Sequence, residues 1–228
     1  APNHKFYKQK FFKKEDKQKK INIGIQRLKT RFSGQIDIIG MRNSSFSKGS
    51  TPIDPKIEGV VFLHDIFDAQ HIYDGFCFND LYEWTIFNLD LITKKNLNIG
   101  VKPHINQIPE SLEIINKLKK KYDHIYWIDP KISNSQIFKS ISFGCTVFGT
   151  IISELAYHGI MPICCGDNPT SSFDFSIQAN SPKEYESLIT NYKDYTRKYN
   201  PSKDEIGAFI YMHYESNKSI KYKDLIFD

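Results

Sequence analysis

Short, mostly apolar runs alternate along the chain with longer segments in which apolar residues recur every three or four positions. Runs of four or five apolar residues are typical of buried strands, whereas the wider spacing indicates helices that bury one face. The expected strands are residues 60–63, 97–101, 124–128, 145–148 and 162–165. The expected helices are residues 73–95, 109–122, 133–142 and 149–159, with further helices starting near residues 181 and 202.

Residues that favour helix ends agree with these boundaries. Pro109 suits the first position of a helix, because proline lacks the N–H that a helix start leaves unpaired. Ser181 precedes Pro182 and provides a capping hydroxyl. Gly159 is a natural carboxyl cap. Strands that alternate with helices predict an α/β fold with a Rossmann-like, doubly wound parallel sheet.

The residues before the first strand follow another pattern. Residues 1–20 hold eight lysines against Glu15 and Asp16, a balance of +6, so the remaining residues carry −1 of the net +5. Residues 21–32 are expected to form a helix, and residues 40–52 are polar and rich in turn formers, as in a linker. We therefore expect a basic tail, helix and linker in residues 1–50, and a Rossmann-like domain with carboxyl-terminal helices in residues 51–228.

The charge distribution limits the partners. A protein that binds a nucleic-acid duplex usually spreads basic residues over a folded face, so the nearly neutral body argues against nucleic acid. The basic start has two interpretations, which stay open here. It contacts anionic lipid at the inner face of the cytoplasmic membrane, helped by its aromatic residues, or it is a solvated linker or a truncated helix. The aromatic residues are Phe6, Tyr7, Phe11 and Phe12.

Cysteine usage and hydropathy indicate a cytoplasmic protein. No run approaches the roughly 20 apolar residues of a membrane span. The four cysteines have no C-x-x-C spacing and lie in apolar segments, which favours reduced, buried thiols in a cytosolic protein. They are Cys77, Cys145, Cys164 and Cys165.

Polar residues follow three of the expected strands. His64 and Asp65 follow the first, Lys102 and His104 end the second, and residues 149–150 follow the fourth. In such a sheet, ligands bind beyond the carboxyl ends of the strands, so these groups should converge. We expect one of the two histidines to donate a hydrogen bond to a phosphate oxygen, or to protonate the departing one.

The turn at Gly149 and Thr150 opens the helix of residues 149–159. Its first N–H groups, those of Gly149, Thr150 and Ile151, should be free, with the positive end of the helix dipole behind them. Together with Lys102, they would suit a diphosphate. Glu154 lies about one turn further on, where its carboxylate is able to accept hydrogen bonds from a sugar hydroxyl.

The chain lacks the sequence motifs of several common α/β enzymes. The chain lacks a dinucleotide-binding G-x-G-x-x-G, a Walker A loop and a G-x-S-x-G elbow, which excludes common dehydrogenases, P-loop NTPases and α/β-hydrolases. His64, Asp68 and His71 are mixed potential metal ligands, but Asp68 and His71 are equally suited to capping the next helix. No Asp-x-Asp pair lies at a strand end, so we expect metal-independent chemistry.

The segment from Gly149 to Pro162 resembles the donor-binding segment of GT-B glycosyltransferases, Gly-Ser/Thr-x-x-x-Glu-x-x-x-x-Gly-x-Pro. The matching residues are Gly149, Thr150, Glu154, Gly159 and Pro162. Two further segments, Gly166-Asp-Asn-Pro169 and His64-Asp-x-x-Asp-x-x-His71, extend the resemblance to the carboxyl-terminal half of bacterial capsule and surface-polysaccharide transferases. It covers roughly residues 57 to 195.

The resemblance implies transfer of a sugar from a nucleotide sugar to a growing glycan, without a bound cofactor. It also implies that Asp167 or Asn168 lies near the donor sugar. From its position one turn inside the helix, we expect Glu154 to bind the nucleotide ribose, and the catalytic candidates are His64 and Asp65 at the end of the first strand. A GT-B site lies between two domains, and residues 1–50 are at most a remnant of the second. We therefore expect the acceptor-binding half in the rest of a longer protein or in a partner chain.

Two alternatives remain at this stage. A GT-B-like sugar-nucleotide epimerase shares the fold and the donor site but needs no acceptor. A non-catalytic docking module would keep the Rossmann-like scaffold and lose nucleotide binding.

Overall fold

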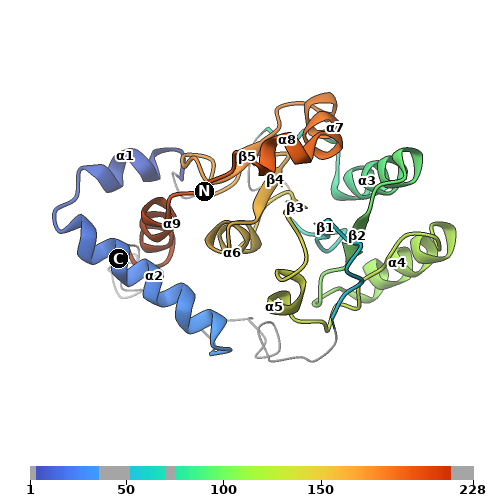
Figure 1. Cartoon of the computed structure of the whole chain (residues 1–228), viewed down its shortest axis with the longest axis horizontal. Coiled ribbons are helices and arrows are strands. Elements are labelled where there is room, and N and C mark those ends of the chain that lie inside the picture. The colour runs from blue at the N-terminus through green and yellow to red at the C-terminus, as the bar shows by residue number, and fades with distance from the viewer. Residues whose placement is uncertain (1–3, 36–51, 70–74, 217–228) are drawn as a thin grey trace, which may run out of the picture.

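The computed structural model describes residues 4–35, 52–69 and 75–216, and its centre is a five-stranded sheet with helices on both faces (Figure 1). The strand order is β2-β1-β3-β4-β5, and every neighbouring pair is parallel. This confirms the predicted parallel α/β sheet. The strands are β1 (Gly59–Phe62), β2 (Ile99–Lys102), β3 (Phe143–Thr146), β4 (Met161–Cys164) and β5 (Ile177–Gln178).

The predicted strand at residues 124–128 is only a single β-bridge, between Trp127 and Val101. Val101 donates a hydrogen bond to the Tyr126 carbonyl and accepts one from Ile128 N, each at 2.9 Å. The segment does not continue as a ladder, because it turns at Asp129 and Pro130, and proline has no N–H to donate. With this bridge counted, the sheet has the Rossmann strand order.

The long helix on the β2 side begins later than predicted. Asp80 accepts a hydrogen bond from Glu83 N at 2.7 Å and caps α3 (Leu81–Lys95). Of the predicted earlier part, residues 75–80 are not helical, and residues 73–74 lie outside the described residues. The predicted helix at residues 133–142 is reduced to one turn, α5 (Asn134–Ile137).

The predictions based on Pro109, Ser181 and Gly159 are confirmed. Pro109 stands at the start of α4 (Pro109–Lys121), and Ser181 accepts a hydrogen bond from Glu184 N at 3.2 Å at the start of α7 (Pro182–Thr190). Gly159, with a φ of +74°, follows α6 (Ile151–Tyr157) in the left-handed conformation that glycine favours. A short helix, α8 (Tyr192–Thr196), follows α7.

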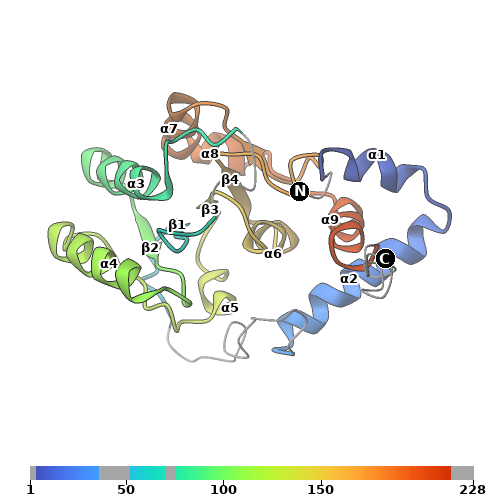
Figure 2. The ribbon, with the colours of Figure 1, turned by 180° about the vertical axis from the view of Figure 1, so that it is seen from behind.

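The basic start of the chain is folded, so its interpretation as a solvated linker is wrong. It forms a 3-10 turn (His4–Phe6), α1 (Tyr7–Phe12) and α2 (Lys17–Phe32), four residues longer at its start than predicted. Both helices pack against α9 (Lys203–Ile210), which continues as a π-helix (Tyr211–Glu215). Figures 1 and 2 show α1 and α2 around α9, at the opposite end of the molecule from α3 and α4.

The contact between α2 and α9 depends on two glycines. A Cβ atom added to Gly24 would lie 2.0 Å from the carbonyl oxygen of Gly207, so the two backbones approach closely. Tyr7 and Phe11 are buried in the same cluster, which also contains Leu28 and Phe209. Of the predicted linker at residues 40–52, residues 40–51 lie outside the described residues.

No helix within the described ranges is long and apolar enough to cross a membrane. All four cysteines are free; three are buried and Cys77 is half-buried.

Candidate functional site

The strand order reverses between β1 and β3, which are adjacent in the sheet but not in the chain. At such a switch point, the connections leave toward opposite faces and leave a crevice at the carboxyl ends of the strands. His64 lies two residues beyond the end of β1, and the Gly149 turn lies three beyond β3. The structure therefore brings together two of the three strand ends predicted to converge.

His64 lies directly over the end of β3. Its Nε2 is 3.0 Å from Oγ1 of Thr146 and 3.4 and 3.5 Å from the backbone nitrogens of Val147 and Phe148. Because a backbone N–H only donates, we assign Nε2 as the acceptor and place the ring proton on Nδ1. The Phe148 ring covers the imidazole, with 4.2 Å between centroids. His64 thereby connects β1 to the segment that leads into the Gly149 turn.

Burial lowers the pKa of His64 to about 3, and the nearby His104 contributes to the same shift. The imidazole is therefore neutral at physiological pH. A neutral ring still donates one hydrogen bond through Nδ1–H, but it is not an imidazolium acid. His104 itself is exposed, and its Nδ1 accepts a hydrogen bond from Asn106 N at 3.2 Å.

Asp65 is held by the start of α4. Its carboxylate accepts hydrogen bonds from Ile108 N at 2.8 Å, from the Ser111 hydroxyl at 2.6 Å and from Phe67 N at 3.0 Å. Burial by itself raises the pKa of Asp65, but these hydrogen bonds outweigh it and the net pKa lies below the ordinary value. This environment keeps Asp65 ionised and fixes the loop after β1 onto α4.

Lys102, at the end of β2, turns toward α5. Its ammonium donates hydrogen bonds to the Ile132 carbonyl at 2.8 Å and to Oδ1 of Asn134 at 2.7 Å. Burial lowers its pKa to about 8, and the carboxylates of Glu154 and Asp129 oppose that shift. Lys102 is therefore a largely desolvated cation at neutral pH, within the electrostatic reach of Glu154.

Glu154 is buried on α6, where it forms an ion pair with Arg31 of α2. One carboxylate oxygen lies 3.0 Å from Nη1 of Arg31, and the two side chains are 5% and 2% exposed. The Thr150 and Asn134 side chains lie close enough to this carboxylate to lower its pKa. Complete burial raises the pKa of Glu154, and the Arg31 ion pair offsets part of that rise. Asn134, which accepts a hydrogen bond from Lys102, thus also lies beside Glu154, and both Lys102 and Asn134 are half-buried.

The Gly149 turn is open. Gly149 has a φ of +106° and is exposed, and no heavy atom lies within 4 Å of a Cβ built on it. Among the described contacts, the N–H groups of Gly149, Thr150 and Ile151 have no acceptor. The helix that follows, α6, is only seven residues long.

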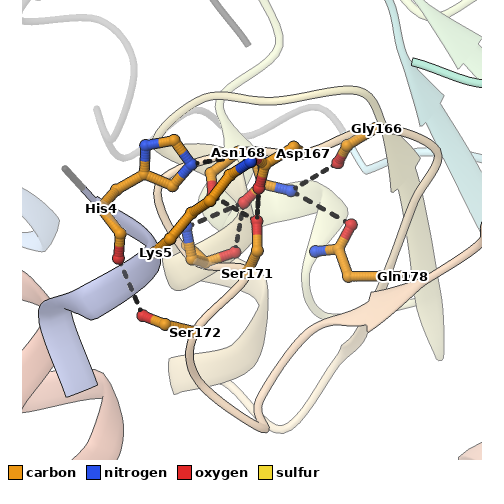
Figure 3. Close-up of polar contacts among 9 residues, drawn as sticks. His4, Lys5, Gly166, Asp167, Asn168, Ser171, Ser172 and Gln178 are labelled. Atoms are coloured by element: carbon orange, nitrogen blue, oxygen red, sulfur yellow. Dashed lines mark hydrogen bonds and ion pairs between the residues drawn. The ribbon is translucent and has the colours of Figure 1, made fainter. Parts of the chain in front are cut away.

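The turn after β4 is occupied by the start of the chain (Figure 3). Asp167 accepts a hydrogen bond from Nε2 of His4 at 3.0 Å, and Nζ of Lys5 lies 3.5 Å away. The carbonyl of His4 accepts a further hydrogen bond from Ser172 at 3.1 Å. Asn168 is fully buried, and its amide donates to Gly166 O at 3.1 Å. In this arrangement, both predicted donor-sugar residues bind protein groups.

The mixed histidine–aspartate motif supplies no metal cluster in the described part of the chain. Asp68 is exposed, and its carboxylate accepts a hydrogen bond from Ala69 N at 2.9 Å. His71 lies outside the described residues. No group of three potential ligands capable of holding a metal occurs among the residues that the structure describes.

Sequence reasoning missed the contributions of Arg31, Asn134 and His4, which come from distant parts of the chain. Arg31 had a detectable signal: it lies three residues beyond buried Leu28, on the face of α2 that contains Ile21 and Gly24. A basic residue on an apolar helix face requires a buried partner. The partner itself, 123 positions away, had no signal in the local pattern.

Comparisons with known proteins give structural similarities only. No family model matches the chain, and no curated protein matches its sequence. Among solved structures, Thermosulfurimonas dismutans KpsC, a beta Kdo 2,4 transferase, aligns with a TM-score of 0.49 and 12% identity over 84% of this chain and 55% of its own. Anabaena HepE, solved with UDP and glucose, aligns with a TM-score of 0.46 and 8% identity over 68% of this chain and 44% of its own.

A GtfA/B complex aligns with a TM-score of 0.44 and 11% identity over 70% of this chain and 35% of its own. The chain thus spans between 35% and 55% of the length of these three proteins. A TM-score below 0.5 does not establish a common fold, so neither family nor function follows from these similarities.

Proposed function

We propose that this chain is the nucleotide-sugar-binding half of a GT-B-type glycosyltransferase that transfers a sugar to a growing capsular or surface polysaccharide. The observation that supports this most is the convergence of polar groups at the carboxyl edge of the sheet. His64 contacts the segment that leads into the Gly149 turn, and Asn134, which accepts a hydrogen bond from Lys102, lies beside Glu154. His64, Lys102 and the Gly149 turn lie at the carboxyl ends of three different strands, the edge at which ligands bind in this fold.

In this proposal, the leaving diphosphate binds beside the open Gly149 turn. The N–H groups of residues 149–151 and the Lys102 ammonium stabilise its negative charge, so no metal and no cofactor is needed. A pKa of about 8 leaves Lys102 protonated at neutral pH, as this role demands. His64 contributes a hydrogen bond from its neutral ring, because its low pKa leaves no imidazolium to donate a proton.

The proposed ribose contact of Glu154 carries a structural condition. The carboxylate is buried against Arg31, so a ribose hydroxyl reaches it only if the end of α2 shifts. The same holds for Asp167, which reaches a donor sugar only if His4 and Lys5 give way. Asn168 is fully buried, so its proposed role is to stabilise the turn and not to contact the sugar directly. Donor binding is therefore proposed to move the amino-terminal helices.

The acceptor side is assigned to another domain of the same protein or to a partner chain. GT-B sites lie between two domains, and the described residues contain one parallel sheet. The proposed setting is the cytoplasm, at the inner face of the membrane. Asp65 remains a candidate catalytic group, although its present hydrogen bonds fix α4.

A thermal-shift screen tests the proposal directly. We expect one class among UDP-, GDP-, CMP- and CDP-sugars to raise the unfolding temperature, since ligand at 100 times its dissociation constant adds about 2.7 kcal/mol of stability. EDTA should leave the shift unchanged. If no nucleotide sugar stabilises the chain at millimolar concentration, the donor-binding role is wrong.

A further inference from the structure

The amino-terminal unit, formed by α1, α2 and the residues that flank α1, exposes both apolar side chains and lysines. Phe6, Phe12 and Ile23 are 46%, 53% and 40% exposed. Lys10, Lys13 and Lys19, on the same amino-terminal unit, are exposed too. We refer to these six residues as the α1–α2 outer surface. None of its lysines forms an ion pair with a carboxylate among the described contacts.

The packing of the two helices sets this surface. Tyr7 and Phe11 are buried against α9 and fix one side of α1, so the remaining aromatic residues of that segment face outward. On α2, the buried residues Ile21, Gly24 and Leu28 fix the inner side, and Ile23 lies away from them. A folded unit that already buries four large apolar groups still exposes three more. Exposed apolar groups concentrated on one unit indicate an interaction site.

The positive charge of the amino-terminal unit favours an anionic partner. Residues 4–35 contain eleven basic and two acidic residues, a balance of +9, whereas the whole chain carries +5, so the remainder carries −4. The two arginines face inward, toward Glu154 and Glu215, and the outward cations are lysines. This end of the molecule is complementary to an extended anionic surface.

We propose that the α1–α2 outer surface docks the protein on an anionic lipid bilayer. Phenylalanine and isoleucine side chains insert among the acyl chains near the headgroups, while flanking lysines bind anionic headgroups, as in other interfacial helices. A nucleic acid fits less well, because Ile23 is unable to stack on a base and the outward cations lack the planar guanidinium that favours bidentate phosphate contacts. The proposal does not depend on the glycosyltransferase assignment.

The inner ends of the same unit contact the candidate site. Arg31 of α2 binds Glu154, and His4, which precedes α1, binds Asp167. Docking through the outer surface therefore engages the same unit that contacts Glu154 and Asp167.

The test is flotation of the 228-residue chain with vesicles of phosphatidylcholine alone or mixed with phosphatidylglycerol. We expect binding to the anionic vesicles only, weakened by salt. The triple variant Lys10→Gln/Lys13→Gln/Lys19→Gln should lower the partition coefficient about fivefold for each lysine neutralised. The matched control, Lys56→Gln/Lys120→Gln/Lys183→Gln, changes the net charge equally at exposed positions elsewhere and should retain binding.

The apolar part is tested with Phe6→Ala/Phe12→Ala, which should reduce binding at least about tenfold, given the burial energy of such side chains. The control is Phe67→Ala/Tyr82→Ala, at exposed aromatics that line a separate cavity of about 580 Å³ beside α3 and α4. A Phe12→Trp variant should show a blue-shifted emission on adding anionic vesicles, which reports insertion even if the alanine pair folds poorly.

Three results would overturn the proposal. The first is a lack of flotation with anionic vesicles. The second is an equal loss of binding in the control variants, which would indicate net charge rather than this surface. The third is a single-stranded RNA oligomer that binds the chain through the same residues while vesicles do not, which would assign the surface to nucleic acid.

Discussion

At the residue scale, the main feature of the candidate site is a buried ion pair with a third charge nearby. Arg31 and Glu154 are almost fully enclosed, and Lys102 lies within reach of the same carboxylate. A buried ion pair adds little net stability, because the cost of desolvating both charges offsets most of their attraction. Removal of one partner is strongly destabilising, because the other charge stays buried without it. The three residues therefore contribute to stability as a unit, and any ligand that takes over one of them must compensate the others.

The Arg31–Glu154 pair predicts a non-additive response. Glu154→Ala should lower the free energy of unfolding by about 3–5 kcal/mol, since the guanidinium stays buried without this carboxylate. The double variant Arg31→Met/Glu154→Leu should cost clearly less than that single change. Urea denaturation of the wild type and these variants measures the difference. Additive losses would mean that the two side chains are not coupled.

The lowered pKa of Lys102 predicts that the free energy of unfolding depends on pH in the alkaline range. Its folded-state pKa is about 8, below the ordinary value of 10.5, so between these values the unfolded chain holds a proton that the folded chain has released. The free energy of unfolding should therefore rise with pH across this window, by up to about 1.4 kcal/mol per pH unit from this group. Lys102→Met removes the rise. Stability curves for wild type and variant that stay parallel from pH 7 to 10.5 would contradict the assignment.

At the element scale, capping residues specified three helix ends well, whereas other helix starts and the strand lengths were poorly specified. Ser181, Pro109 and Gly159 act through their own backbone neighbours, so their effect is visible in a short window. The bridge at Trp127 and the short β5 depend on pairing with another strand, which a short sequence window does not show. The site residues differ in the same way. The positions of His64 and Lys102 at strand ends could be predicted from the alternation of strands and helices. The contacts of Arg31 and His4 depend on the packing of α1 and α2, which local sequence does not show.

The crossing of α2 and α9 provides an element-scale prediction. Alanine normally stabilises a helix interior relative to glycine by about 1 kcal/mol. At Gly24 the added Cβ would meet the Gly207 carbonyl at 2.0 Å, and a backbone atom has nowhere to move. Gly24→Ala should therefore destabilise the protein by at least about 1–3 kcal/mol, as overpacking does.

The control is Gln26→Ala, an exposed position on the same helix, which should stay within about 0.5 kcal/mol of wild type. Thermal and urea unfolding measure both variants. A neutral or stabilising Gly24→Ala would show that α2 does not approach α9 as described.

At the scale of the whole molecule, a GT-B-type transferase needs two domains, each typically 100–150 residues, facing one cleft. We therefore expect the 228-residue chain to bind its donor but to transfer sugar slowly, because acceptor contacts and water exclusion come from elsewhere. A coupled assay of nucleotide release with and without glycan acceptors measures this. Steady acceptor-dependent turnover by this chain alone would refute the prediction, and a base would then be sought among His64, Asp65, Asp68 and His71.

The central claim is a nucleotide-sugar site at the carboxyl edge of the sheet, and calorimetric titration tests it most directly. We expect one nucleotide sugar to bind wild-type protein, and Glu154→Gln, which keeps the shape of the side chain, to weaken that binding by about 1.5–3 kcal/mol, the contribution of a hydrogen bond to a charged group. Phe67→Ala/Tyr82→Ala should bind as wild type does. Binding unaffected by Glu154→Gln in a folded variant, or no binding by any nucleotide sugar, would contradict the claim.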